Sequence, residues 1–191
     1  ASITFHDVLC SGGSYVQTYR DTTVENELHI DSSTIFRLNC SSRAVTLTMG
    51  TTSSAGEIHQ DGGGFQFNSN TSNVAKIAAA SQLYPWFNVA GYNIDWDGGG
   101  SGSNVEIENG NYHGTTTSGG GGVTIKLTGN MEMDAFTLSN GDHLDLNGQR
   151  AEFDGIFDVD GTVDADGMFI LNNTIDYDGS AFSNANNCTM I

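Results

Sequence analysis

A turn dipeptide of small polar residues recurs every six or seven residues in the C-terminal part of the chain. Between successive dipeptides, apolar and polar residues alternate as they do in a half-buried β-strand. Gly adopts turn conformations that other residues avoid, and Asn and Asp tolerate them. The repeat therefore predicts short strands joined by tight corners. Its members are Asn140-Gly141, Asn147-Gly148, Asp154-Gly155, Asp160-Gly161, Asp166-Gly167, Asn172-Asn173 and Asp178-Gly179.

Two chain paths fit such a repeat, an antiparallel meander and a chain that coils in one direction. Asn-Gly and Asp-Gly are strong hairpin signals, so the meander is the first candidate. In a meander the residues that flank a two-residue turn share a face, which would place Phe157 beside Asp164 and leave both faces mixed. In a one-way coil every repeat presents the same positions inward, and the apolar and acidic side chains separate. The pattern therefore predicts a parallel β-solenoid.

The solenoid interpretation assigns a face to each side chain of the repeat. If each coil has three sides, it takes about 18 to 20 residues, and residues 123–191 hold about three coils. The acidic residues Asp158, Asp164 and Asp176 then point outward. The inward residues are all apolar or aromatic: Phe136, Leu138, Leu144, Leu146, Ala151, Phe153, Phe157, Val159, Val163, Ala165, Phe169, Leu171, Ile175 and Tyr177.

The outward aspartates predict a second feature, pairs of stacked carboxylates. A coil of this length places Asp158 over Asp176 and Asp145 over Asp164, about 4.8 Å apart. Carboxylates so close repel each other, more strongly where water is excluded. In the simpler interpretation salt screens this repulsion, so no cofactor is required. Ca²⁺ bound at Asp158/Asp176 or at Asp145/Asp164 is the alternative, because this cation takes oxygen ligands in flexible geometry.

The segment "MFIL", residues 168–171, differs from its neighbours on the outward face. Its inward residues are Phe169 and Leu171, yet Met168 and Ile170 are apolar as well. An exposed apolar strand face usually has a partner that covers it. We therefore predict that Met168 and Ile170 form an interface with another subunit or with the N-terminal region.

The rest of the chain also favours an all-β fold, because turn-forming and β-favouring residues are abundant and Pro occurs once. We predict an N-terminal β region over 1–96, a Gly-rich loop or linker over 97–122 that includes the short strand "NVEIE", and the solenoid over 123–191. Residues 73–81, "NVAKIAAAS", are the only segment that reads as helical. Strands of the N-terminal region are predicted at 25–30, 34–39, 44–49 and 64–68.

The balance of charge excludes several partners. Six Lys and Arg against 23 Asp and Glu give a formal net charge of −17, so nucleic acid and anionic membranes would repel the chain. No apolar run reaches the roughly 18 residues of a membrane span, and no signal peptide remains at Ala1, so we expect a soluble protein. An acidic secreted or virion protein is the preferred interpretation, and a protein adapted to high salt is the alternative.

Candidate reactive residues are few and scattered. Cys10, Cys40 and Cys188 allow one disulfide, with Cys10–Cys40 as the first pairing to test, but a buried free thiol is the simpler expectation for each. The histidines show no metal-ligand spacing, so surface or hydrogen-bonding roles are expected. Residues 83–96 gather five aromatics, either as a small core between the β regions, which we prefer, or as a glycan-binding surface. The histidines are His6, His29, His59, His113 and His143.

Solenoid enzymes that cleave polysaccharides work in a long groove, with paired carboxylates or a basic residue near a cation. About three coils give only a short groove. After residue 122 the only cationic residues are Lys126 and Arg150, so binding of an acidic sugar polymer there would be unfavourable. We therefore predict that the protein is not an enzyme.

The segment "RAVTLTMGTTSSAGEIHQDGGGFQF", residues 43–67, resembles a strand-and-turn pattern of fibre, spike and decoration proteins of tailed viruses. Short β-helical coils are similar to those on which such bacteriophage appendages are built, and the likeness covers about half of the chain. The resemblance implies a homotrimer on the virion surface. It further implies attachment to other virion proteins through one end and exposure at the other, where a host surface glycan is a candidate partner.

The expected function is that of a non-enzymatic structural protein of the virion surface, either a capsid decoration protein or a component of a fibre or tail appendage. A cellular extracellular adhesin or filament subunit is the alternative. A carbohydrate-binding or polysaccharide-degrading β-helix protein is the third. A virion protein would have a stoichiometry fixed by capsid or tail symmetry, whereas a filament subunit would polymerise head to tail.

Overall fold

The computed structural model describes residues 2–13, 15–54, 56–61, 64–69, 72–79, 86–88, 94–95, 104–107, 110–118, 122–177, 182–183 and 189–191. These residues form β-strands and no helix, so the all-β prediction is confirmed. No helix in this part of the chain is long and apolar enough to cross a membrane. The strands are β1 Ile3–Cys10, β2 Tyr15–Thr18, β3 Thr22–Asp31, β4 Ile35–Asn39, β5 Val45–Met49, β6 Glu57–Asp61, β7 Gly64–Asn68, β8 Ala75–Ala79, β9 Trp86–Asn88, β10 Ile94–Asp95, β11 Asn104–Ile107, β12 Gly110–Thr117, β13 Thr124–Leu127, β14 Met131–Leu138, β15 His143–Asp145, β16 Arg150–Phe153, β17 Phe157–Val159, β18 Thr162–Asp164, β19 Met168–Leu171, β20 Ile175–Tyr177, β21 Phe182–Ser183 and β22 Thr189–Met190.

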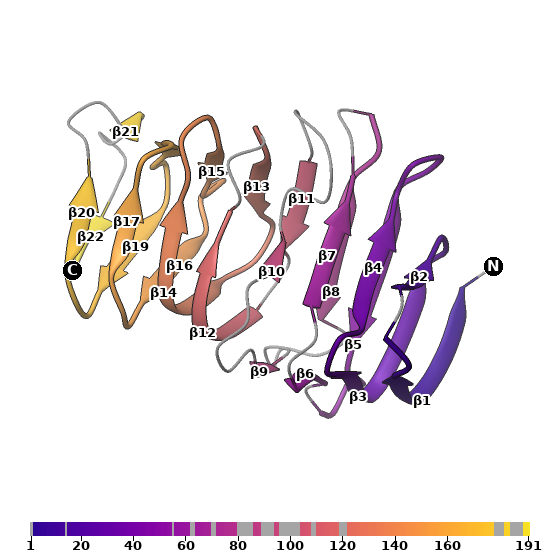
Figure 1. Ribbon diagram of the computed structural model, residues 1–191. Coiled ribbons are helices and arrows are strands. Elements are labelled where there is room, and N and C mark those ends of the chain that lie inside the picture. The colour runs from indigo at the N-terminus through magenta and orange to yellow at the C-terminus, as the bar shows by residue number, and fades with distance from the viewer. Residues whose placement is uncertain are drawn as a thin grey trace.

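Every described pairing between two strands is parallel, which excludes the antiparallel meander. The strands lie side by side in one long array, with the two ends of the chain at its opposite ends (Figure 1). One sheet has 18 strands, and a second contains β2, β4, β7 and β10. Parallel pairing requires that the chain return to the same end of the ladder before the next paired strand begins.

Three parallel ladders run through the C-terminal part, and each joins every third strand: β15–β18–β21, β16–β19–β22 and β17–β20. Ala151 pairs with Phe169 and Leu144 with Val163, so paired positions are separated by the length predicted for one coil. In the N-terminal part the separation varies: Phe5 pairs with Val24 at a separation similar to that of the C-terminal part, whereas Leu28 pairs with Ile58 at a larger one. The predicted separation of stacked positions is therefore correct for the C-terminal part.

Alternate side chains of each strand are buried. Of the residues predicted to point inward, those from Phe136 to Phe169 are all buried, and Leu171 and Ile175 are half-buried. Aromatic rings stack inside, and the centroids of Phe153 and Phe157 lie 4.1 Å apart with nearly parallel planes. The prediction for Tyr177 is wrong, since this residue is 55% exposed. It lies at the end of a ladder, because β20 pairs only with β17 in the described chain.

The corner glycines fall into two classes. Gly141 and Gly148 have positive φ angles of 87° and 74°, as the turn chemistry predicts. Gly155, Gly161 and Gly167 do not have positive φ, and they are needed for a different reason. A Cβ atom on Gly161 would lie 2.6 Å from the backbone oxygen of Asp142, and the other two would also meet backbone oxygens. These three corners therefore stack against the preceding corner at a distance that only Gly permits. Asp178-Gly179 lies outside the described residues.

The segment predicted to be helical, residues 73–81, contains strand β8 instead, so that prediction is wrong. β8 pairs with β5 on one side and with β11 on the other. Ala75 and Ile77 are buried in these ladders. The ladder hydrogen bonds and the burial of alternate residues outweigh the helix preference of Ala.

The strands predicted over 25–30, 34–39, 44–49 and 64–68 correspond to β3, β4, β5 and β7 and are confirmed. The strand expected within "NVEIE" is β11, which pairs with both β8 and β13. Parallel pairing thus continues across the stretch predicted to be a loop or linker. The division into 1–96, 97–122 and 123–191 stays a prediction.

The two classes of glycine predict different costs of substitution. We expect Gly161→Ala to destabilise the protein by about 3 kcal/mol, because the added Cβ forces two stacked corners apart. Gly141→Ala is the matched control, since no atom lies within 4 Å of its added Cβ. It should cost only about 1 kcal/mol, the penalty for positive φ. Urea unfolding of both variants measures the difference, and an equal or smaller loss at position 161 would contradict the close stacking of corners.

Candidate functional site

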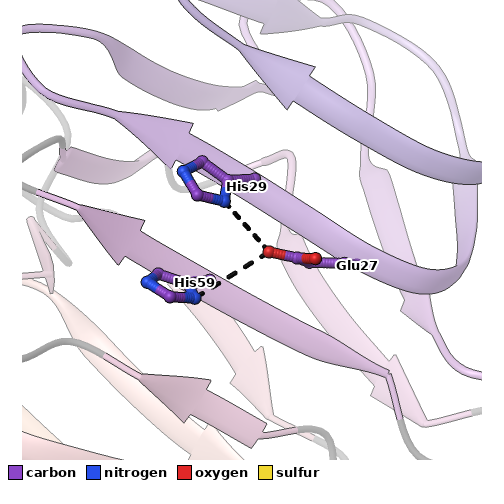
Figure 2. A group of neighbouring side chains, drawn as sticks. All are labelled: Glu27, His29 and His59. Carbon is purple, nitrogen blue, oxygen red and sulfur yellow. Dashed lines mark hydrogen bonds and ion pairs between the residues drawn. The ribbon is translucent and has the colours of Figure 1, made fainter.

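Two histidines and a glutamate that are distant in sequence come together on the outer face of β3 and β6. Glu27 and His29 project from β3 and His59 from β6, and all three side chains lie on the same face (Figure 2). His29 pairs with His59 in the parallel register, so their rings stack with centroids 4.8 Å apart and an interplanar angle of 22°. Register alone thus brings together two imidazoles from separate strands.

The Glu27 carboxylate lies between the two imidazoles. Its Oε1 atom is 3.0 Å from Nδ1 of His29 and 3.8 Å from Nδ1 of His59. One candidate ligand atom from each of the three residues lies within 4.8 Å of the others. Glu57 adds a second carboxylate, whose Oε1 is 3.7 Å from Nδ1 of His59. Imidazole nitrogen and carboxylate oxygen are ligands that divalent transition metals bind.

This cluster cannot be seen from the spacing of ligands within one segment of the sequence. Its signal is a repeated tripeptide, Glu27-Leu28-His29 and Glu57-Ile58-His59. In a strand the first and third residues of such a tripeptide share a face, and the apolar middle residue points to the other. Leu28 and Ile58 are indeed buried opposite each other. The other histidines are not part of the described cluster. His6 is exposed on β1, His113 pairs in register with Asn88, and His143 begins β15.

The outward carboxylate of this cluster belongs to a register column that continues through the molecule. The column pairs Asp7, Glu27, Glu57, Trp86, Asn111, Glu132, Glu152 and Ile170 in that order. Near its C-terminal end Arg150 lies between two stacked glutamates, with nitrogens 2.5 Å from Glu132 and 2.9 Å from Glu152. One cation thus bridges a pair of stacked carboxylates and offsets part of their repulsion.

The predicted pair Asp145/Asp164 does stack, and it belongs to a second column. The register places Lys126 opposite Asp145, and the Nζ atom lies 3.6 Å from Oδ2. Lys126 therefore supplies a cation beside this pair from the preceding ladder position. Ca²⁺ at Asp145/Asp164 would have to bind beside that ammonium group.

The predicted pair Asp158/Asp176 also stacks, in a third column. Neither residue has a salt bridge in the described part of the chain. Burial raises the pKa of Asp158, and the negative charges of Asp160 and Asp176 raise it further. Repulsion from the stacked Asp176 thus adds to the effect of burial at Asp158. Ca²⁺ binding at this pair stays a prediction.

The remaining predicted residues are placed as follows. Met168 is 37% exposed and Ile170 is half-buried. β1 lies at the other end of the array from β19 (Figure 1), so another subunit is the partner left to test.

Cys10 and Cys40 are free and buried, and burial raises the pKa of each thiol to about 11. Cys188 and most of residues 83–96 lie outside the described residues.

Comparison of the chain with protein-family models, with curated proteins and with solved structures gives no match.

The raised pKa of Asp158 predicts a pH-dependent gain from Asp158→Asn. A raised pKa means that the protonated carboxyl favours the folded state. Its contribution is present below the ordinary value of 3.8 and is lost as the pH rises through the raised value. We therefore expect the Asn variant to be more stable at pH 7, by less than about 1 kcal/mol. The gain should disappear below the ordinary pKa and shrink as NaCl screens the repulsion. Urea unfolding at several pH values measures it, and a loss of stability at pH 7 would contradict the repulsion.

Calcium binding and charge screening by salt both raise the stability of the protein as ionic strength increases. They differ in whether the effect is specific to Ca²⁺. Melting temperatures at fixed ionic strength, with millimolar CaCl₂ or with matched NaCl, separate them. Equal melting temperatures in the two salts would contradict a specific calcium site. A fall in melting temperature as NaCl is added would contradict carboxylate stacking itself.

Proposed function

We propose that the protein is a non-enzymatic structural component of a virion surface, a capsid decoration protein or part of a fibre or tail appendage, and that its array is a short parallel β-solenoid. The observation that carries the proposal is the unbroken register column from Asp7 on β1 to Ile170 on β19. A parallel ladder of this length makes a stiff, elongated element, which suits a spacer or support.

The ends of the array support a place in a larger assembly. At the N-terminal end a cavity of about 210 Å³ is lined mainly by apolar side chains of β1 to β4, among them Phe5, Val16 and Phe36. Ile3, Phe5 and Leu9 are exposed there, and Tyr177 and Ile191 are exposed near the C-terminal end. Edge strands and exposed apolar residues favour association with other chains. Attachment through one end to other virion proteins would cover one such surface.

The outer face supports the choice of partners. With a formal charge of −17 the surface repels nucleic acid and anionic membranes. The exposed side chain of Met168 and its neighbour Ile170 interrupt this acidic surface and are the candidate contacts of a homotrimer. Contact with a host surface glycan depends on residues 83–96 and stays a prediction.

The solenoid proposal predicts that a whole coil can be removed. Because Arg150 pairs with Met168, deletion of the segment 151–168 places Phe169 where Ala151 was and preserves the register of β19 and β20. We expect this variant to fold, with a melting temperature a few degrees below that of the full chain. The control deletion is one residue shorter, 151–167, which turns each inward side chain outward and should abolish cooperative unfolding. Circular dichroism during heating compares the two, and equal behaviour would overturn the solenoid.

The structural role predicts a defined oligomer. We expect light scattering after gel filtration to give a trimer, and Met168→Ser with Ile170→Thr to give a monomer with unchanged circular dichroism. The control variant carries Thr162→Ser and Thr174→Ser at outward positions of neighbouring ladders and should stay trimeric. A monomeric wild-type chain, or a trimer that survives the double substitution, would contradict this interface. Imaging of the native assembly then tests whether the stoichiometry follows capsid or tail symmetry.

A cellular filament subunit is the second candidate, and the distribution of charge favours it. Arg20, Arg37 and Arg43 are half of the basic residues and lie in the N-terminal part, whereas no Lys or Arg follows Arg150. Both ends expose apolar side chains, and the less acidic N-terminal end would repel the C-terminal end of the next chain less than two C-terminal ends repel each other, which favours head-to-tail stacking. Such stacking would give fibres whose length grows with protein concentration, instead of a trimer of fixed mass.

A further inference from the structure

We propose that Glu27, His29 and His59 bind a divalent first-row transition-metal ion, with Zn²⁺ as the first candidate. The site lies on the outer face of β3 and β6 (Figure 2). It uses residues that the structural role described above does not require. The proposal rests on the arrangement of three ligand atoms and on the chemistry of those ligands.

The ligand atoms already lie close to the separations that a metal needs. In a tetrahedral site with bonds of 2.0 to 2.1 Å, neighbouring ligand atoms are about 3.3 Å apart. Oε1 of Glu27 is 3.0 Å from Nδ1 of His29 and 3.8 Å from Nδ1 of His59. No pair of candidate ligand atoms exceeds 4.8 Å, so small side-chain rotations suffice. The parallel register holds the two histidines opposite each other and so limits the entropy lost on binding.

The donor set favours a transition metal over calcium or magnesium. Two imidazole nitrogens and one carboxylate oxygen suit Zn²⁺, Cu²⁺ or Ni²⁺, whereas Ca²⁺ and Mg²⁺ take oxygen ligands. The three side chains are about one-third exposed, from 32% to 36%, so an ion can reach them from solvent. Glu57 or a water molecule can complete the coordination, because the Glu57 carboxylate lies 3.7 Å from Nδ1 of His59.

A bound ion would join two ladder strands that are far apart in the sequence, β3 and β6. It would also offset the negative charge of Glu27 and Glu57, which stack in the same column. Since the ion binds only where the folded register has assembled the ligands, it stabilises the folded state by mass action. At free Zn²⁺ of 100 times the dissociation constant, we expect the melting temperature to rise by about 5 to 10 °C.

The test uses the full chain after treatment with a chelator and its removal. Isothermal titration with ZnCl₂ should show one ion bound per chain, and melting curves should show the predicted rise. His59→Asn should weaken Zn²⁺ binding at least tenfold, and so should Glu27→Gln. Asn is a suitable replacement because Asn88 occupies the next position of the same register column. Equal ionic strength of CaCl₂ should not reproduce the rise.

His6→Asn is the matched control. His6 also lies near carboxylates, 3.6 Å from Glu25 and 3.9 Å from Asp7, but it is a single exposed imidazole. This variant should bind Zn²⁺ as the wild type does. Circular dichroism checks that each variant is folded, and the melting temperature in chelator measures any purely structural role of the cluster. Absence of binding by the wild type, or binding that survives His59→Asn, would overturn the proposal. So would a stability loss in chelator with no zinc-dependent difference between the variants.

Discussion

Parallel pairing in register is the constraint on which the rest of the molecule depends. It places each side chain next to the equivalent position of the following ladder strand, about 4.8 Å away. Inside, this stacks the ring of Phe136 on that of Phe157 and fills the interior with apolar side chains. Outside, the same rule places like charges together, as for Glu132 with Glu152. Apolar contact favours the stack, and repulsion between outward carboxylates opposes it.

The C-terminal part could be predicted because its repeat is short and regular. Each corner dipeptide marks a strand end, so the inward positions and the pairs Asp145/Asp164 and Asp158/Asp176 follow from counting residues. In the N-terminal part the separation between paired positions varies, and the intervening segments carry no regular mark. Residues 73–81 were misassigned for a related reason, since the buried alternation of β8 has few residues and Ala favours a helix when read alone.

The histidine cluster shows what local patterns omit. His29 and His59 look isolated in sequence, and only the register of β3 with β6 brings them together. The two Glu-x-His tripeptides are visible in the sequence, but their separation exceeds the length predicted for one coil, so their pairing could not be inferred from the C-terminal repeat. The corner glycines also depend on residues distant in sequence, because Gly155, Gly161 and Gly167 are required by the adjacent corner and not by their own φ angle.

On the outer face, repulsion between stacked carboxylates is offset by different groups at different places. Arg150 lies between Glu132 and Glu152, and Lys126 lies beside Asp145. With only six Lys and Arg for 23 acidic residues, the chain cannot treat every stacked pair in this way. Beside Glu27 and Glu57 two imidazoles, His29 and His59, lie two residues along the same strands and offer ligands for a metal ion. With the proposed metal ion bound, the histidine pair would make the stability of this part of the stack depend on the free metal concentration, whereas Arg150 carries its charge permanently.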